Sequence, residues 1–148
     1  GSKKAGKTTV LKEILKDEEN YGGIVTYVIR DDGIPPKYVM LRDINDVDKR
    51  GIIARRNNTS TGLNPNIDTF ENLGTGILDE YVNSKAGLIV IDEVGFLENA
   101  AMEYQKKILQ AMDKKKTILA LRKEKTLFIE KIISSKDVYL VDLDMLKR

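Results

Sequence analysis

The segment Gly1 to Thr9, GSKKAGKTT, carries glycine, lysine and threonine at the spacing that a phosphate-binding loop needs. It fits the pattern GxxxxGK[ST], in which the glycines let backbone N–H groups approach phosphate oxygens. In such a loop Lys7 would reach the β- and γ-phosphates, and the hydroxyl of Thr8 would bind Mg²⁺. The pattern therefore predicts a nucleotide site made of Gly1, Ser2, Lys3, Lys4, Ala5, Gly6, Lys7, Thr8 and Thr9.

Short patterns of this kind also arise by chance, and a second motif, LIVIDE (Leu88 to Glu93), supports the first. An apolar strand that ends in a carboxylate is the Walker B arrangement, in which Asp92 would hold Mg²⁺ through water, opposite Thr8. The chain has no histidine, so acid–base chemistry falls to Asp, Glu, Lys or Tyr. Glu93 is the best candidate to polarise the attacking water. The alternatives are a turn or helix cap for the two acids, or an ion pair between Glu93 and a lysine.

An arginine near the γ-phosphate is harder to assign. Arg122 follows an expected strand, Thr117 to Leu121, and strand ends face ligands in open α/β sheets. Arg122 is therefore favoured over Arg55 and Arg56, which lie in a long polar segment. For each of the three, a solvated surface charge is the simpler alternative.

Helices and strands that could position these residues alternate along the chain. Helical periodicity begins at Lys7, and β-branched runs on either side of a short turn predict an antiparallel hairpin. The expected helices cover residues 7–16, 68–82, 100–112 and 125–134, and the expected strands cover residues 24–30, 37–44, 86–92, 117–121 and 137–143. Residues 45–67 are expected to form a long irregular loop. This alternation predicts an α/β sheet with helices on its faces.

Composition limits the remaining possibilities. A chain of 148 residues with 41% apolar residues suits one domain, 1–148, with its own core. A net charge of +2 gives no reason to expect nucleic acid, and no apolar run reaches the roughly 20 residues of a membrane span. With no cysteine, disulfides and thiolate metal sites are excluded. We expect a cytoplasmic monomer that binds nucleoside triphosphates and does not bind a membrane.

Five segments occur in the order and rough spacing found in a known protein family. They are GSKKAGKTT, GGIVTYVIR, DTFENLG, GLIVIDEVGFLE and KDVYLVDL. The chain resembles the small nucleoside-triphosphatase family first described from thermophiles, which includes the human cancer-related nucleoside-triphosphatase. The resemblance implies a RecA-like P-loop NTPase fold, with a mostly parallel sheet and an antiparallel edge hairpin. It also implies slow, Mg²⁺-dependent hydrolysis of ATP, GTP and other nucleoside triphosphates. The roles that the resemblance carries over are phosphate and metal binding for Gly1, Gly6, Lys7 and Thr8, the Walker B acid for Asp92, and the catalytic acid for Glu93.

The chain departs from the family pattern in two respects. Family loops often read Gly-Pro-Pro-Gly-Val-Gly-Lys-Thr, whereas this chain has Ser2-Lys3-Lys4-Ala5 between its glycines. The strand that should precede the loop is missing. We expect the native protein to carry about five more apolar residues before Gly1, the length of an ordinary strand.

Two other functions fit the same motifs. The first is a nucleotide or small-molecule kinase, in which a cationic loop would close over a second substrate. The residues of that loop would be Arg42, Lys49, Arg50, Arg55 and Arg56. The second is a nucleotide-dependent switch that binds tightly and turns over only when a partner stimulates it.

Overall fold

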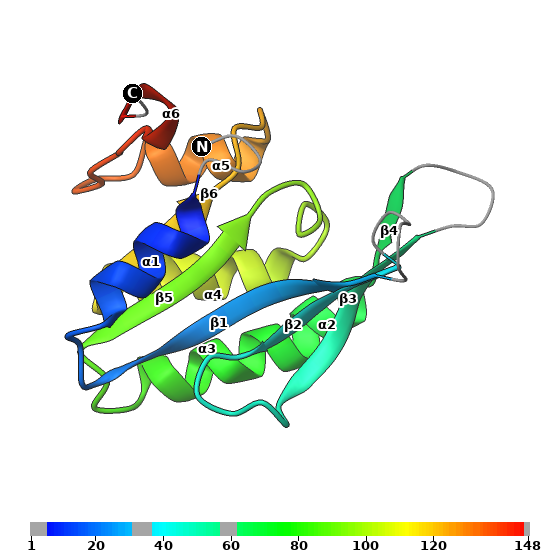
Figure 1. The fold of residues 1–148 in the computed structure, drawn as a ribbon, viewed down its shortest axis with the longest axis horizontal. Helices are drawn as coiled ribbons and strands as arrows, with labels where there is room; N and C mark the ends of the chain where they lie inside the picture. The colour runs from blue at the N-terminus through cyan, green and yellow to red at the C-terminus, as the bar shows by residue number, and fades with distance from the viewer. Residues whose placement is uncertain (1–5, 31–36, 57–61, 147–148) are drawn as a thin grey trace.

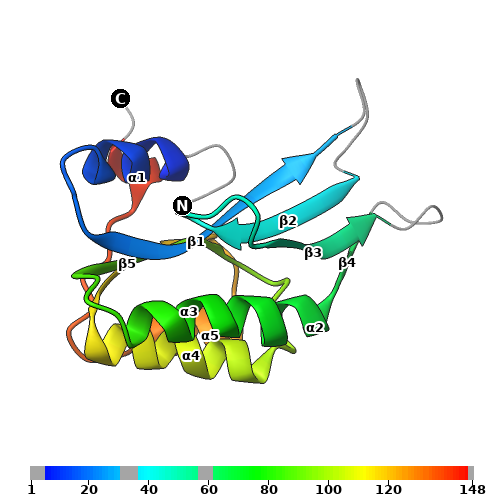
Figure 2. The ribbon, with the colours of Figure 1, turned by 90° about the horizontal axis from the view of Figure 1, so that it is seen from below.

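The computed structural model describes residues 6–30, 37–56 and 62–146, and in this part of the chain a mixed six-stranded sheet lies between two layers of helices (Figures 1 and 2). The strands are β1 (Tyr21–Ile29), β2 (Tyr38–Asp43), β3 (Arg50–Arg56), β4 (Leu63–Pro65), β5 (Leu88–Val94) and β6 (Lys116–Leu121). The helical segments are α1 (Lys7–Leu15), α2 (Ile67–Thr69), the π-helical turn η1 (Phe70–Gly74), α3 (Thr75–Val82), α4 (Met102–Lys114), α5 (Leu127–Ile133) and α6 (Leu143–Leu146). Within the described ranges, no helix is long and apolar enough to cross a membrane.

The elements that carry the two motifs are confirmed. The helix expected after the glycine loop is α1, and the apolar run that ends in two acids is β5. The expected hairpin is formed by β1 and β2, which pair antiparallel from Ile24↔Asp43 to Ile29↔Tyr38. α4, β6 and α5 correspond to the expected helix 100–112, strand 117–121 and helix 125–134.

The sheet, of order β4-β3-β2-β1-β5-β6, is mixed and not mostly parallel. β1, β5 and β6 are parallel neighbours, whereas β1 to β4 pair antiparallel in sequence. The difference arises because residues 45–67, expected as an irregular loop, contain β3 and β4. The apolar residues of β3 form a short run between arginines without clear alternation, and pairing with β2 leaves Ile53 and Ala54 buried. The α/β class with helices on both faces is confirmed.

The two faces of the sheet are covered unequally. On one face, Leu11 of α1 packs with Leu88 and Val90 of β5 and with Ala120 of β6. The other face carries the larger core under α3, α4 and α5, as Figure 2 shows. Its fully buried side chains include Ile24, Leu41, Phe70, Leu78, Ile91 and Ile108. Because strand side chains alternate between faces, the packing of Leu88 and Val90 directs Asp92 toward α1.

The carboxylate of Glu71 caps a helix other than its own. Its Oε2 accepts a hydrogen bond of 2.9 Å from the backbone N–H of Tyr104, in the first turn of α4. A carboxylate at this end of a helix satisfies an unpaired N–H and interacts well with the helix dipole. Asp68, expected to cap the helix that precedes Glu71, lies inside α2, and Asn66 occupies the N-cap position without a side-chain hydrogen bond. Glu71 therefore ties η1 to α4.

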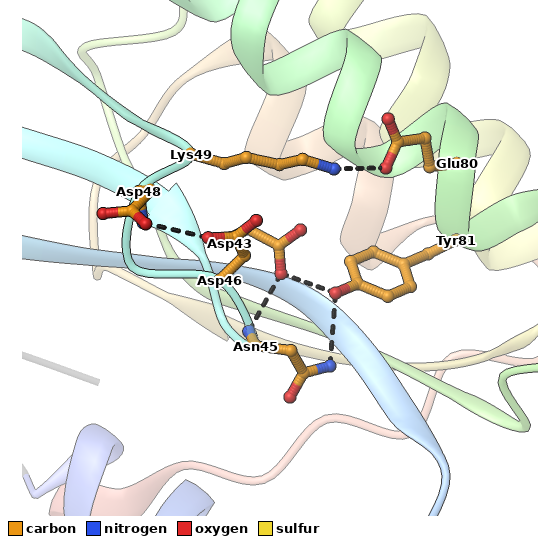
Figure 3. A network of polar contacts seen from close by, with 7 residues as sticks. All are labelled: Asp43, Asn45, Asp46, Asp48, Lys49, Glu80 and Tyr81. Carbon is orange, nitrogen blue, oxygen red and sulfur yellow. Dashed lines mark hydrogen bonds and ion pairs between the residues drawn. The ribbon is translucent and has the colours of Figure 1, made fainter.

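A polar network anchors the turn between β2 and β3 to α3 (Figure 3). The hydroxyl of Tyr81 donates to Oδ1 of the buried Asp43 at 2.5 Å, and the backbone N–H of Asn45 donates to the same oxygen at 2.9 Å. Burial, reinforced by the hydrogen bond to Asp43, raises the pKa of Tyr81 to about 12. Nearby, Lys49 forms a 2.8 Å ion pair with Glu80 of α3. These contacts fix the antiparallel half of the sheet to the helical layer.

Gly23 of β1 lies where a side chain cannot fit. Its φ of +138° is unfavourable for residues with a Cβ, and an added Cβ would lie 1.8 Å from the carbonyl oxygen of Val90. Gly23 and Val90 are register partners in the parallel β1–β5 pair. The close approach of these two strands, and with it the position of Asp92, therefore depends on glycine at this position.

The strand expected at residues 137–143 is wrong. After α5 the chain passes through a turn and a segment without regular secondary structure, which pairs with no strand of the described sheet, and then forms α6. A β-branched sequence becomes a strand only when a neighbour satisfies its backbone. Tyr139, Leu140 and Val141 are exposed, and they line a groove of about 900 Å³ beside β6, with Val10 and Ile14 of α1 on its other wall. The further strand expected before Gly1 stays a prediction.

Gly23→Ala should lower the free energy of unfolding by at least about 2 kcal/mol, because it adds both backbone strain and a clash with a backbone carbonyl. Urea unfolding measures this change. Gly76→Ala is the matched control: Gly76 is an exposed residue of α3 with open space at its Cβ position, so alanine there should raise stability by about 0.4–1 kcal/mol. Equal effects of the two substitutions would contradict the strand packing described here.

Candidate active site

The two sequence motifs meet at the start of α1 and the carboxyl end of β5. The hydroxyl of Thr8 donates to the carboxylate of Asp92, with Oγ1 lying 3.2 Å from Oδ2 and 3.5 Å from Oδ1. These residues are 84 positions apart in the chain, so only the fold brings them together. The convergence expected from the motifs is therefore present in the structure.

The described part of the glycine loop leads directly into α1. Gly6 has φ +87° and ψ +20°, a left-handed conformation that suits glycine, and its carbonyl accepts a 2.9 Å hydrogen bond from Val10. Gly6 makes no side-chain cap, so the first N–H groups of α1 point outward as donors that suit an anion. Lys7 is half-buried, and Thr9 is exposed. The remaining residues expected in this site, Gly1, Ser2, Lys3, Lys4 and Ala5, lie outside the described residues.

Asp92 is a buried carboxylate, and its surroundings act on its pKa in opposite directions. Burial raises its pKa above the ordinary value, and the negative charge of Glu93 acts in the same direction. The hydrogen bond from Thr8 and the positive charge of Lys7 oppose this rise. A buried carboxylate with a raised pKa gains most from a nearby cation, because the cation favours its ionised form.

Hydroxyl and carboxylate oxygens, as in Thr8 and Asp92, are the ligands that hard divalent cations prefer. No group of three or more acidic, histidine or cysteine side chains that could hold a metal occurs in the part of the chain that the structure describes. A cation here would therefore take most of its ligands from water and from phosphate oxygens. This is how a small hard cation binds in sites for phosphoryl transfer, with one or two protein groups.

Glu93 departs from the geometry of an ordinary strand residue. Its φ of +77° lies in the left-handed region, and the β5–β6 register shifts between Ile91 and Val94. A residue other than glycine in this region costs about 1–3 kcal/mol, and such strain is found preferentially at functional sites. The bulge turns the Glu93 side chain outward beside Arg122, whose Nη1 lies 3.5 Å from Oε1 of Glu93. The expected alternative, an ion pair of Glu93 with a lysine, is replaced by this pairing with Arg122.

Glu98, which follows in the same loop, was not given a role from the sequence. It is only 4% exposed, and its Oε1 accepts a hydrogen bond from the backbone N–H of Gly95. Burial raises the pKa of Glu98 to about 8, and the nearby carboxylates of Glu93 and Glu124 contribute in the same direction. Glu98 matches a glutamate of the family pattern, but its burial could not be predicted, because it depends on how the loop after β5 folds back.

The cationic residues that could have formed a lid for a second substrate lie in or beside the antiparallel strands. They are Arg42, Lys49, Arg50, Arg55 and Arg56. Arg55 lies over the ring of Tyr38, with its Cζ 5.2 Å from the ring centroid, and Lys49 is paired with Glu80. Of the three candidate arginines, the structure therefore brings only Arg122 to the acidic end of β5.

Comparisons with known proteins agree with the fold class and with the family resemblance. The sequence model of a family described as NTPase matches residues 1–148. Relatives named Nucleoside-triphosphatase THEP1 are 29% identical over 144 residues in Thermotoga sp. (strain RQ2) and 27% identical over 144 residues in Thermotoga maritima. Each of these alignments covers 94% of this chain and 80% of the relative. The solution structure of a human cancer-related nucleoside triphosphatase is 20% identical, with a TM-score of 0.63 over 93% of this chain and 80% of that one. The resemblance inferred from the motifs and the α/β fold are thereby confirmed.

The free energy of unfolding should fall as the pH rises from about 4.5 to about 8. In this range the folded protein keeps a proton on Glu98 that the unfolded chain has lost, since the ordinary pKa is 4.5 and the folded value is about 8. The slope from this group approaches about 1.4 kcal/mol per pH unit. Urea unfolding at several pH values measures it. Glu98→Gln should flatten the slope, and the exposed control Glu103→Gln should not; an unchanged slope in Glu98→Gln would refute the assignment.

Proposed function

This chain belongs to the NTPase family, and we propose that it hydrolyses nucleoside triphosphates, ATP and GTP among them, to the diphosphate and inorganic phosphate with the help of Mg²⁺. The observation that carries the proposal is the contact of Thr8 with Asp92 at 3.2 Å, which joins the phosphate-loop helix to the acidic strand. The named relatives, Nucleoside-triphosphatase THEP1, support the same chemistry.

The triphosphate would lie against the start of α1. Gly6 allows close approach of the backbone, the N–H groups of the first turn donate to phosphate oxygens, and Lys7 neutralises the β- and γ-phosphates. Thr9 adds an exposed hydroxyl and a backbone N–H at the same end of the helix. The loop residues Gly1, Ser2, Lys3, Lys4 and Ala5 would complete the cradle.

Mg²⁺ would be held by the Thr8 hydroxyl and, through water, by Asp92. When bound, the ion supplies positive charge that stabilises the charge developing on the phosphate oxygens. Asp92 is suited to this position because its burial makes it depend on a cation for full ionisation.

Glu93 would orient the attacking water. The water oxygen forms a bond to the γ-phosphorus, while the bond from that phosphorus to the β–γ bridging oxygen breaks and its electron pair leaves with the diphosphate. The proton lost by the water passes to the Glu93 carboxylate. Arg122, within 3.5 Å of Glu93, is the candidate to stabilise the transferring phosphoryl group in the same chain. Turnover should be slow in the absence of an arginine supplied by a partner.

Three expectations accompany this proposal. The protein would act in the cytoplasm as a monomer, and residues 1–148 would form a single P-loop NTPase domain.

The kinase alternative loses its main support, since the cations expected in a lid lie in or beside β2 and β3. A switch protein would differ from the hydrolase by requiring a partner for turnover.

Glu93→Gln should bind nucleotide as the wild type does and lose hydrolysis by about 100-fold or more, the usual contribution of a general base. Glutamine keeps the size and hydrogen-bonding capacity of the side chain and removes the base. Phosphate release with ATP and Mg²⁺, together with calorimetric binding of a non-hydrolysable analogue, separates the two effects. Glu103→Gln serves as the exposed control. Phosphate release that survives in Glu93→Gln would show that another group orients the water.

Lys7→Ala should abolish both nucleotide binding and turnover, because it removes the positive charge nearest to the phosphates. The same titration with the non-hydrolysable analogue measures the loss of affinity, and the lost charged contact alone, about 1.5–3 kcal/mol, would raise Kd at least about 10-fold. Lys16→Ala, an exposed lysine at the other end of α1, is the matched control. Unchanged affinity in Lys7→Ala would rule out the phosphate-loop assignment.

A further inference from the structure

Arg122 lies between two carboxylates, and its contacts with them differ in kind. Its Nε lies 2.9 Å from Oε1 of Glu124, within hydrogen-bond distance, whereas its Nη1 lies 3.5 Å from Oε1 of Glu93. A charge-assisted hydrogen bond has N···O distances of about 2.7–2.9 Å. Glu124 is therefore the tight partner of the guanidinium, and Glu93 is the loose one.

The backbone around Arg122 holds this arrangement in place. The N–H of Arg122 donates to the carbonyl of Val94 at 2.9 Å, and the N–H of Glu124 donates to the carbonyl of Arg122 at 2.9 Å. The first bond ties Arg122 to the strand that carries Glu93, and the second curls the chain so that Glu124 faces the guanidinium. These bonds fix the backbone from which both side chains extend.

The side chains of Arg122 and Glu124 are also packed against the loop after β5. A Cβ on Gly95 would lie 2.9 Å from Cδ of Arg122 and 3.2 Å from Oε2 of Glu124. The guanidinium of Arg122 lies over the ring of Phe96, 5.9 Å from its centroid. Oε2 of Glu124 is buried and accepts no hydrogen bond from any residue that the structure describes. A buried unsatisfied carboxylate oxygen is costly, and an ion pair that served stability alone would be expected to satisfy it.

We propose that Glu124 is a positioning residue for hydrolysis: it holds Arg122 through Nε so that the outer guanidinium nitrogens can pass from Glu93 to the γ-phosphate of a bound nucleotide. This inference rests on the proposed function. A guanidinium has five N–H donors in a fixed fork, so binding through Nε leaves the outer nitrogens to contact a second anion. The γ-phosphate carries more negative charge than Glu93 and competes for those nitrogens.

The exchange would couple substrate binding to the water-orienting group. Before the nucleotide binds, the Glu93 carboxylate interacts with Arg122. When Arg122 turns to the γ-phosphate, that carboxylate becomes able to accept a hydrogen bond from the attacking water. Glu124 keeps Arg122 within reach of the γ-phosphate both before and after the nucleotide binds. Removing Glu124 should therefore destabilise the transition state more than it weakens the binding of substrate.

A double-mutant cycle of Arg122→Gln and Glu124→Gln tests the inference by phosphate release with ATP and Mg²⁺. Glu124→Gln alone should lower kcat by about 10- to 100-fold, the effect of a misplaced catalytic group, with KM within about threefold of the wild type. In the Arg122→Gln background, Glu124→Gln should have no further effect on kcat, because Glu124 acts only through Arg122. Glu130→Gln, an exposed glutamate of α5, is the control.

Two results would overturn the inference while leaving the proposed function intact. One is a wild-type kcat in Glu124→Gln, and the other is an undiminished effect of that substitution in the Arg122→Gln background. Unfolding free energies of all variants identify a merely structural role, which would lower stability without changing kcat of the folded protein. If Glu124→Gln does not fold, Glu124→Asp, which keeps the charge but retracts it, should give a reduced kcat. The absence of phosphate release from the wild type and from Glu130→Gln would overturn the proposed function itself.

Discussion

The contact between the Thr8 hydroxyl and the Asp92 carboxylate depends on an apolar interaction two and four residues earlier in β5. Leu11 of α1 packs on Leu88 and Val90, and the alternation of strand side chains then directs Asp92 to the same face. A helix seated on these residues has its first turn beside the acid. Hydrophobic packing thus decides where the polar chemistry occurs, and a loss of this packing would separate the site residues without changing any of them.

The carboxyl ends of β5 and β6 bring acidic side chains and backbone strain together in a few residues. Glu93 has a left-handed backbone, Glu98 is buried, and Glu124 has an unsatisfied oxygen. Each of these features costs stability, and the carboxylates of Glu93 and Glu124 flank the guanidinium of Arg122. Proteins tolerate such costs where function requires a fixed arrangement, and the rest of the fold compensates. The large core on the opposite face, centred on residues such as Ile91 and Ile108, supplies that compensation.

The sequence predicted the parts of the molecule in which local pattern and tertiary environment agree. α1 and β5 have clear periodicity or a continuous apolar run, so their existence and the meeting of Thr8 with Asp92 could be expected. β3 could not be expected, because its short apolar run between arginines becomes a strand only through pairing with β2. The strand predicted for residues 137–143 was wrong for the opposite reason, because these residues have a strand-like composition but pair with no neighbouring strand. The pairing of Glu93 with Arg122 follows from a β-bulge in β5, which leaves no mark in a single sequence.

The groove beside β6 lies along an open margin of the described sheet. β6 is the outermost strand of that sheet, and apolar side chains of α1 and of the segment after α5 are exposed along it. A free strand edge beside an apolar surface offers an extended polypeptide both backbone hydrogen bonds and burial of apolar area. A further strand at this position would therefore extend the sheet and cover the side chains that line the groove.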